Sequence, residues 1–296
     1  MQPKKTVLVA GGDLRYGYTA RVLAKVYEVW AVGFTRQVLP FPEVQLASLT
    51  DKGLPKFDHL VLPIPVSEDG IHLNAPFQTQ PVTVTELIPL LKPGAAVFGG
   101  KFGQTAARFR SAGLTVSDYL AEEEMSTRNA VPTAEGAVQI MLEEMPCTLH
   151  GSPVLVLGFG RIGSRLAGVL HALGAEVTVA ARDVADRARA ELYGCRSIPL
   201  NRINACAGNF SAVCNTIPAK VITEETLKAI QPDALILDLA SKPGGVDWDA
   251  AQALGRRVVW ALSLPGKTAP FTAGEIIAKT ILHMLETDEG GVMHET

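Results

Sequence analysis

The 296-residue chain lacks most of the features that mark secreted, metal-binding or nucleic-acid-binding proteins. Its four cysteines (Cys147, Cys195, Cys206 and Cys214) show no C-x-x-C spacing, so we expect reduced thiols in a cytoplasmic protein. The net charge is −3 and no basic run occurs, which argues against nucleic acid as a partner. No apolar stretch reaches the roughly 18 residues of a membrane span, and the N-terminal residues do not have the pattern of a signal peptide. We therefore expect no membrane partner.

The motifs of two enzyme classes are also missing. The six histidines are scattered, without H-x-x-x-H or H-E-x-x-H spacing, so no metal site is predicted. No G-x-S-x-G occurs, which leaves hydrolase chemistry at a nucleophile elbow without support. What is present is 47% hydrophobic and 19% charged residues, a composition typical of a soluble globular protein with an ample core. A length of 296 residues predicts two domains.

A glycine-rich stretch in the middle of the chain has the pattern of a dinucleotide-binding turn. Residues 154–163 read V-L-V-L-G-F-G-R-I-G, a short apolar run that ends in G-x-G-x-x-G. A helical pattern with one apolar face follows, and residues 176–181 have the pattern of the next strand. Strand, glycine turn, helix and strand form a βαβ unit, the context that makes this motif specific. We predict a Rossmann domain whose cofactor contacts are Gly158, Phe159, Gly160, Arg161 and Ile162.

Each glycine of the motif has a physical reason. Gly158 permits a tight turn, Gly160 lets a pyrophosphate approach a backbone without a β-carbon, and Gly163 allows close packing of helix and strand. The free N–H groups at the start of the helix then face the anion. The alternative is a glycine turn in an α/β domain that has lost its ligand.

The end of the second strand of this unit bears on the choice of cofactor. An NAD site usually has an acidic residue there, which holds the ribose 2′-hydroxyl. This strand instead ends A-A-R-D, with Arg182 just past the expected acidic position. An arginine can bind a 2′-phosphate with two hydrogen bonds, so we expect NADP. Asp183 leaves NAD open, because it could serve the ribose if the strand is one residue longer.

The first part of the chain is predicted to be a second α/β domain. Buried-strand patterns alternate with helical patterns, which is typical of a doubly wound parallel sheet. We expect a flavodoxin-like substrate domain over residues 1–129, with strands near 6–10, 27–33, 58–64, 95–99 and 114–116. Polar residues at the carboxyl ends of such strands are substrate-site candidates. Those residues are Asp13, Arg15, Ser67 and Lys101, and turn or surface roles are the alternative for each.

The second domain is expected to span residues 130–296, with interdomain helices near 133–144 and 272–285, the last one returning to the first domain. The segment from Asn129 to Thr133 has the pattern of a helix start, and Glu135 suits the positive end of that helix. Glu135 is a candidate for catalysis, and simple capping is the alternative. Thr216, Ile217 and Pro218 follow a strand and are expected to line the nicotinamide side of the cofactor.

The second half of the chain resembles the D-2-hydroxyacid dehydrogenases, but it departs from them at three places. Ser241 and Lys242 stand where that family has an arginine after the strand at 234–239. Residues 261–263 read A-L-S where the family has an acid, and 269–271 read A-P-F where it has a histidine. Ketone–alcohol chemistry with that set of catalytic residues is therefore not expected.

Over nearly its full length the chain is similar to the family of dipicolinate synthase A subunits. The first matching stretch is G-G-D-L-R at 11–15, and N-A-V-P-T-A-E-G follows at 129–136. Further stretches lie at 150–152, 157–163, 174–182, 238–247 and 264–274. The resemblance implies an enzyme of two α/β domains that oxidises a dihydrodipicolinate-type precursor to the aromatic dipicolinate during sporulation. It also implies NADP as cofactor and, as partner, the flavoprotein-like B subunit of the synthase.

Roles for polar residues follow from this resemblance and from their positions. Arg15, Lys242 and Lys267 are expected to hold substrate carboxylates, and Asp13 or Glu135 to accept a ring proton. Ser241 is expected to contact the cofactor, and copies of the chain are expected to form a homo-oligomer. Two other functions stay open. One is an NADP-dependent dehydrogenase of another small carboxylate, and the other is a non-catalytic Rossmann subunit of a complex.

Overall fold

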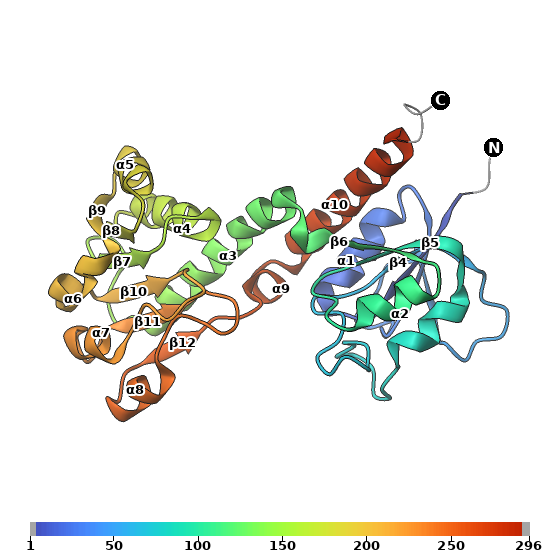
Figure 1. The fold of residues 1–296 in the computed structure, drawn as a ribbon, viewed down its shortest axis with the longest axis horizontal. Helices are drawn as coiled ribbons and strands as arrows, with labels where there is room; N and C mark the ends of the chain where they lie inside the picture. Colours follow the sequence, from blue (N-terminus) through green and yellow to red (C-terminus); the bar gives the residue numbers. More distant parts are fainter. Residues whose placement is uncertain (1–3, 292–296) are drawn as a thin grey trace. The chain divides into compact units, whose positions relative to one another are not determined.

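The computed structural model describes residues 4–291, with side chains described as far as residue 287. These residues form two compact units, each with its own sheet (Figure 1). Unit 1 comprises residues 4–128 together with 270–291, and unit 2 comprises 129–269. The break after Arg128 lies one residue from the expected boundary. The C-terminal segment belongs to unit 1, although the expected boundaries had assigned it to the second domain.

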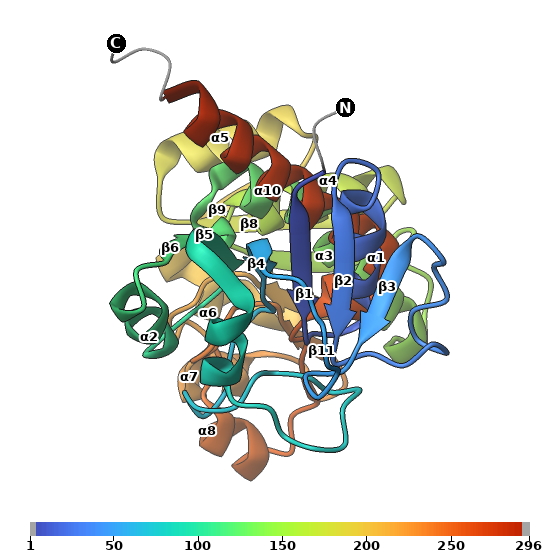
Figure 2. The ribbon, with the colours of Figure 1, turned by 90° about the vertical axis from the view of Figure 1, so that its right-hand side faces the viewer.

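Unit 1 contains a six-stranded parallel sheet in the order β3-β2-β1-β4-β5-β6 (Figure 2). Its strands are β1 (Thr6–Ala10), β2 (Glu28–Val32), β3 (Val44–Ala47), β4 (Phe57–Val61), β5 (Leu91–Gly99) and β6 (Thr115–Asp118). Strand order reverses between β1 and β4. In open α/β sheets the ligand lies beyond the carboxyl ends of the strands at such a point.

The expected flavodoxin-like topology of the first domain was wrong by one strand. Without β3, the order of the five remaining strands is the flavodoxin-like 2-1-3-4-5, and β3 extends this to the Rossmann order 3-2-1-4-5-6. The strand was missed because it has only four residues, V-Q-L-A, of which only Val44 is fully buried. A short, half-exposed edge strand carries little periodic signal.

Two layers cover the sheet of unit 1, because alternate residues of its strands face opposite sides. Val7 and Val9 of β1 pack with α1 (Leu14–Leu23) and α10 (Pro270–Gly291). Leu8 and Ala10 face the other side, where the 3-10 helix η1 (Val84–Leu90) and α2 (Thr105–Ser111) lie.

The return of the C-terminal helix to the first sheet is confirmed. In Figure 1, α10 runs along α1, and the hydroxyl of Thr19 donates to the carbonyl of Gly274 at 3.0 Å. A β-carbon at Gly274 would lie 2.3 Å from the carbonyl oxygen of Arg15, so glycine is needed for this close approach. The last helix of the chain thereby supports the first turn of α1.

Unit 2 contains a second six-stranded parallel sheet, in the order β12-β11-β10-β7-β8-β9. Read from the other edge, this is again the Rossmann order, with the reversal between β7 and β10. The strands are β7 (Pro153–Leu157), β8 (Glu176–Ala181), β9 (Arg196–Pro199), β10 (Ala212–Asn215), β11 (Leu235–Asp238) and β12 (Val258–Trp260). The predicted doubly wound parallel architecture is therefore confirmed for both units.

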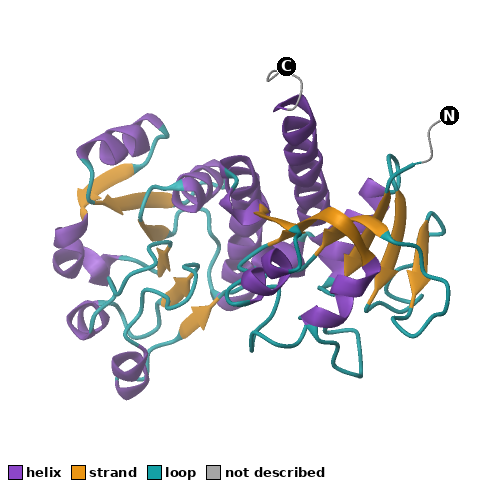
Figure 3. Cartoon of the chain, turned by 45° about the vertical axis from the view of Figure 1, so that its right-hand side comes forward, coloured by secondary structure: helices purple, strands orange, loops and turns teal. Residues whose placement is uncertain are grey.

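Helices cover both faces of the second sheet, and Figure 3 shows them in purple on either side of its orange strands. On one face pack the unit 2 part of α3 (Glu123–Glu144), α4 (Arg161–Ala172), α5 (Val184–Leu192) and α9 (Leu264–Thr268). On the other face lie α6 (Ile203–Cys206), α7 (Glu224–Ala229) and α8 (Trp248–Ala253). Short 3-10 turns complete the described chain: η2 (Tyr119–Ala121), η3 (Leu200–Arg202) and η4 (Ala207–Asn209). None of the helices in the described part has the length and apolar character needed to cross a membrane.

The expected helix start near Pro132 was wrong. Helix α3 begins at Glu123 and continues through Pro132, which is buried within it. Proline removes one backbone donor but does not always end a helix. Thr133 donates its hydroxyl to the carbonyl of Asn129 at 2.7 Å, as helical Thr side chains often do. Glu135 therefore lies in the body of α3 and not in its first turn.

Candidate functional site

The glycine turn of unit 2 follows β7 and leads into α4. Gly158 has φ +92°, a conformation that favours glycine, and its amide donates to the carbonyl of Ala180 on the neighbouring strand. A β-carbon on Gly163 would lie 2.2 Å from the carbonyl oxygen of Gly158, so only glycine permits this helix–turn distance. Thr216 fixes the turn from β10, because its hydroxyl donates to the carbonyl of Leu157 at 2.8 Å.

Gly160 differs from its two neighbours in the motif because it faces open space. It is exposed and caps the start of α4, and no described atom outside its immediate chain neighbours and its own helix lies within 4 Å of the position of a β-carbon there. The turn can therefore admit a group as large as a pyrophosphate against the first N–H groups of a twelve-residue helix. Arg161 is exposed beside it, Ile162 is half-buried, and Phe159 is buried in the core under α4.

A buried Asn–Asp pair joins the carboxyl ends of β10 and β11. The Asn215 side-chain amide donates to Asp238 Oδ1 at 2.8 Å and to the Ile217 carbonyl at 3.0 Å. Asn215 Oδ1 accepts from the Ile217 amide, also at 3.0 Å. These bonds fix the Thr216–Ile217 backbone beside the glycine turn, and Pro218 follows it exposed.

Asp238 also shapes the loop that carries Ser241 and Lys242. Its carboxylate is fully buried and accepts from the backbone amides of Ala240 at 3.1 Å and Gly245 at 2.8 Å. Three N–H donors thus satisfy the oxygen atoms of this buried side chain without a cation. The loop between these anchors leaves Ser241 and Lys242 exposed.

The end of β8 carries an exposed arginine, and the aspartate that follows it caps the next helix. Arg182 is exposed, whereas the carboxylate of Asp183 accepts from the amide of Ala185 at 2.9 Å and caps α5. A second arginine reaches back to the same place. Arg187 Nη1 donates to the carbonyls of Ala181 at 3.0 Å and Arg182 at 2.9 Å. Two guanidinium groups therefore belong to the end of this strand.

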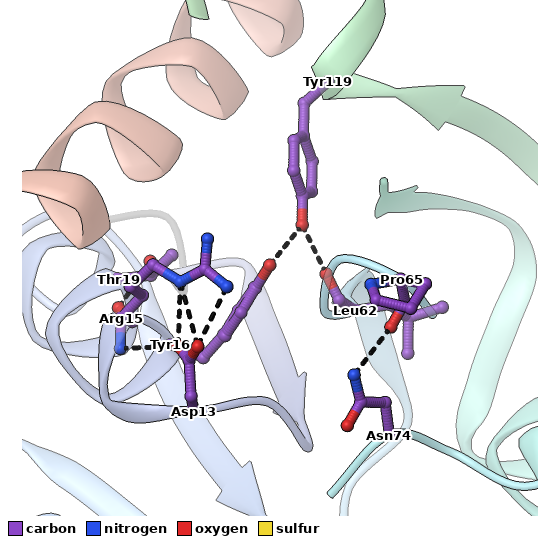
Figure 4. A network of polar contacts seen from close by, with 8 residues as sticks. All are labelled: Asp13, Arg15, Tyr16, Thr19, Leu62, Pro65, Asn74 and Tyr119. Atoms are coloured by element: carbon purple, nitrogen blue, oxygen red, sulfur yellow. Dashed lines mark hydrogen bonds and ion pairs between the residues drawn. The ribbon is translucent and has the colours of Figure 1, made fainter. Parts of the chain in front are cut away.

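In unit 1, Asp13 and Arg15 form an ion pair directly after β1 (Figure 4). Arg15 Nε and Nη2 each donate to the Asp13 carboxylate at 2.9 Å. Asp13 also caps α1, since it accepts from the Arg15 amide at 3.1 Å. Burial opposes the charge of the guanidinium, but its bond with Asp13 and the neighbouring Tyr16 outweigh that effect and raise the pKa of Arg15. The arginine, only 6% exposed, is a permanent buried cation at the point where strand order reverses.

A chain of hydroxyl groups ties this site to the end of β4. Tyr119 donates to the carbonyl of Leu62 at 2.7 Å, so the 2.8 Å bond between the two tyrosines has Tyr16 as its donor (Figure 4). Burial raises the pKa of Tyr16 to about 12 and raises that of Tyr119 well above its usual value. Both phenols are therefore neutral and keep the bond direction across the physiological pH range.

The turn after β1 is closed where the turn after β7 is open. The amide of Gly12 donates to the carbonyl of Asn74 at 2.7 Å, and the Asn74 side chain donates to the carbonyl of Pro65 at 3.2 Å. A β-carbon on Gly11 would lie 2.8 Å from that Asn74 oxygen, and one on Gly12 would lie 2.1 Å from the Tyr16 ring. The Asn74 backbone and the Tyr16 ring therefore pack directly against this turn.

The remaining candidates lie on separate elements, and all are exposed except Ser67, which is half-buried. In unit 2, Glu135 lies on α3 and Lys267 on α9. In unit 1, the Ser67 hydroxyl donates to Asp69 in a surface turn, and Lys101 follows β5. The structure thus brings Asp13 and Arg15 together, groups the glycine turn with Thr216 and Ile217, and places Ser241 and Lys242 on one loop.

Sequence reasoning did not identify the residues that position these groups. They are Asn215, Asp238, Tyr119 and Arg187, none of which belongs to the dinucleotide motif. The only signal in the sequence was that Asn215 and Asp238 each end an apolar strand. A polar residue at the last position of a buried strand is suited to hold the loop that follows.

Two family models match the chain, one in each unit. The N-terminal domain of the dipicolinate synthase A subunit matches residues 6–120. The NAD binding domain of D-isomer specific 2-hydroxyacid dehydrogenase matches residues 123–254.

The dipicolinate synthase A subunit of Bacillus subtilis is 28% identical over 290 residues, which cover 96% of this chain and 98% of that protein. The crystal structure of the corresponding protein from Bacillus halodurans is 29% identical and has a TM-score of 0.88, covering 96% of this chain and 99% of that one. The expected resemblance to the dipicolinate synthase A subunits is thus confirmed over nearly the full chain. A transhydrogenase from Sinorhizobium meliloti, 17% identical with a TM-score of 0.74 over 96% of this chain and 94% of that one, shares the fold.

Similarity to these A subunits, with a dehydrogenase-type NAD binding domain matched in unit 2, supports an oxidoreductase-type role. The same domain supports a nicotinamide dinucleotide as the cofactor, and the open position at Gly160 fits that ligand. The missing arginine, acid and histidine of hydroxyacid dehydrogenases show that a shared NAD-binding domain does not carry their catalytic residues with it.

Proposed function

We propose that this chain is an NADP-dependent oxidoreductase subunit that forms dipicolinate from a dihydrodipicolinate-type precursor during sporulation. It acts in the cytoplasm with the flavoprotein-like B subunit of the synthase, and its own copies associate into a homo-oligomer. The observation that carries the proposal is the similarity to the dipicolinate synthase A subunit of Bacillus subtilis, which extends over 96% of the chain and includes both units.

The reaction removes two electrons and two hydrogens from a partly reduced pyridine ring. One ring hydrogen leaves as hydride, for which the nicotinamide of NADP is the acceptor when it is bound. The other leaves as a proton, which needs a base. The product ring is aromatic, so much of the driving force comes from the substrate. A strong oxyanion-stabilising device is therefore not required of the protein.

We assign the proton to Asp13 or Glu135, and the substrate carboxylates to Arg15, Lys242 and Lys267. Support for Arg15 is direct, because it is a buried guanidinium with Nη1 directed away from Asp13 (Figure 4). Such a group binds carboxylates with charge-assisted hydrogen bonds. Lys242 and Lys267 are exposed ammonium groups that can approach a bound ligand.

Three features support NADP over NAD. Arg182 is exposed at the end of β8, and Arg187 is held against the carbonyls beside it. Asp183, which could have held a ribose hydroxyl, instead caps α5. Two cations at this strand end, beside a carboxylate that serves as a helix cap, suit a 2′-phosphate.

An absorbance assay tests the proposal. The purified chain is mixed with NADP and an enzymatically generated dihydrodipicolinate precursor, with and without the B subunit. The reduced nicotinamide band and the dipicolinate band are followed together, and equal growth of both is expected. Dipicolinate formed only when the B subunit is present would make this chain half of an obligate complex. No growth of either band with both proteins present would refute the proposal.

A further inference from the structure

Lys101 adopts a backbone conformation that glycine would adopt with less strain. Its φ is +55°, and among the described residues only Ser263 is another non-glycine residue with positive φ. The β-carbon of an L-residue is crowded in this left-handed region, where glycine is not. Lys101 also lies in the run G-G-K-F-G, so glycine would be a small change to the local sequence. A side chain kept at a strained position suggests a function for that side chain.

The contacts of Lys101 within the protein do not account for its side chain. Its backbone amide donates to Asp118 Oδ2 at 3.1 Å, a bond that glycine would make equally well. The side chain is exposed, and among the described residues its ammonium has no hydrogen bond or ion pair. The positive charge is therefore available for a ligand.

Backbone hydrogen bonds connect the Lys101 segment to the turn that carries Asp13 and Arg15. Val66 donates to the carbonyl of Gly100 at 3.2 Å, and Asn74 donates to the carbonyl of Val66 at 3.0 Å. The Asn74 carbonyl in turn accepts from Gly12 at 2.7 Å. A β-carbon on Gly100 would lie 2.4 Å from the Ile64 side chain, so this packing is close. The two cations therefore belong to one hydrogen-bonded framework within unit 1.

The strand order sets the separation of the two strand ends from which the Arg15 and Lys101 segments leave the sheet. Arg15 follows β1 and Lys101 follows β5, and β4 is the single strand between them. Two inter-strand spacings amount to about 10 Å. Asp13 holds the Arg15 guanidinium in place, whereas the long, exposed side chain of Lys101 can extend toward it over such a distance. The two side chains can therefore grip two anionic groups of one small ligand.

We propose that Lys101 is a substrate-binding residue, and that Lys101 and Arg15 hold the two carboxylates of one pyridine dicarboxylate. This inference rests on the proposed function and, in place of Lys242 and Lys267, pairs Arg15 with a second cation of unit 1. Arg15 has Nη1 to offer, because Asp13 engages only Nε and Nη2. Lys101 supplies the second cation. The strain at its backbone is the stability cost of keeping an ammonium group there.

The test is calorimetric titration of dipicolinate into the purified chain. Lys101→Gly should weaken binding about ten- to a hundredfold, as expected for loss of one charge-assisted contact. The melting temperature should stay the same or rise by up to a few degrees, because the substitution relieves strain. Lys101→Arg, which keeps the charge, should retain most of the affinity. Ser263→Gly also places glycine at a position with positive φ, but in unit 2, and should leave dipicolinate binding unchanged.

A ligand with one carboxylate sharpens the test. Pyridine-2-carboxylate can use Arg15 alone, so its affinity should respond much less to Lys101→Gly than that of dipicolinate. Wild-type affinity for dipicolinate in Lys101→Gly would overturn the inference, and so would no binding by the unmodified chain. Turnover with wild-type kinetics in Lys101→Gly would sink the inference and leave the proposed function standing. Dipicolinate binding that depends on Lys101, without any turnover even when the B subunit is present, would support the inference and refute the proposed function.

Discussion

The two units of this protein have the same strand order and put it to different uses. In unit 2 the turn after the first strand is open at Gly160, where a β-carbon would meet no described atom outside its immediate chain neighbours and its own helix. In unit 1 the corresponding turn is closed by Asn74 and by the ring of Tyr16. A buried arginine lies beside the closed turn, whereas a helix N-terminus lies at the open one. Strand order thus determines where a ligand can bind, and the side chains at that edge decide which ligand it is.

The largest effect is expected from Arg15→Ala, which removes the cation of unit 1. The substitution removes the proposed contact between Arg15 and a substrate carboxylate, and loss of one member of such a buried charge pair typically costs about 2–5 kcal/mol of binding. We expect the apparent Michaelis constant for substrate to rise by about a hundredfold or more, while the dissociation constant for NADP stays unchanged. Arg21→Ala, an exposed residue of the same helix paired with Glu43, is the matched control and should be neutral. An unchanged Michaelis constant in Arg15→Ala would show that the assignment is wrong.

The converse experiment closes the open turn of unit 2. Gly160 has φ −75° and free space at its β-carbon, so Gly160→Val should fold with a normal melting temperature. The valine would occupy the approach of the pyrophosphate, and we expect cofactor binding to weaken about a hundredfold. Dipicolinate binding should not change. If fluorescence titration finds normal cofactor affinity in this variant, the dinucleotide does not bind at this turn.

A smaller effect is expected at the end of β8. Arg182→Ala should weaken NADP binding about tenfold, a modest loss because the arginine is exposed, and should leave NAD binding unchanged. Arg189→Ala is the matched control, since Arg189 lies on α5 and pairs with Asp186. The ratio of the two dissociation constants, measured for each variant, is the readout. Equal loss for NADP and NAD would contradict a 2′-phosphate contact.

The smallest effect concerns stability against acid in unit 1. Burial opposes the charge of Asp58, but Lys92 and the bonds from Thr6 outweigh that effect and lower its pKa from 3.8. Because the pKa of Asp58 is lower in the folded state, its ionised carboxylate stabilises the fold at any pH above its pKa in the unfolded chain. This contribution is lost as the pH falls through its pKa in the folded protein. The melting temperature of Asp58→Asn should therefore lie below wild type at pH 6, by the equivalent of at most about 1 kcal/mol. The gap should close as the pH falls below 4, and a gap that persisted at low pH would exclude this mechanism.

Local patterns were sufficient to predict much of unit 2. A buried strand, three glycines at fixed spacing, an amphipathic helix and a second strand lie within 28 residues (154–181), and each of these signals depends only on near neighbours. The same locality explains the errors. The edge strand β3 has four mostly exposed residues, and Pro132 resembles a helix start although α3 passes through it.

The sequence by itself determined two parallel α/β sheets and the dinucleotide turn, because the periodicity and spacing that encode them are short-range. The return of the last helix was expected only by analogy with related two-domain proteins. Tertiary structure alone decided which polar groups meet. Tyr16 and Tyr119 bond across 103 residues of chain, and Asn215 and Asp238 across 23. The closure of unit 1 by Asn74 depends equally on contacts between distant segments. Such pairings leave no periodic trace, since each requires only that two side chains reach the same strand edge after the sheet has formed.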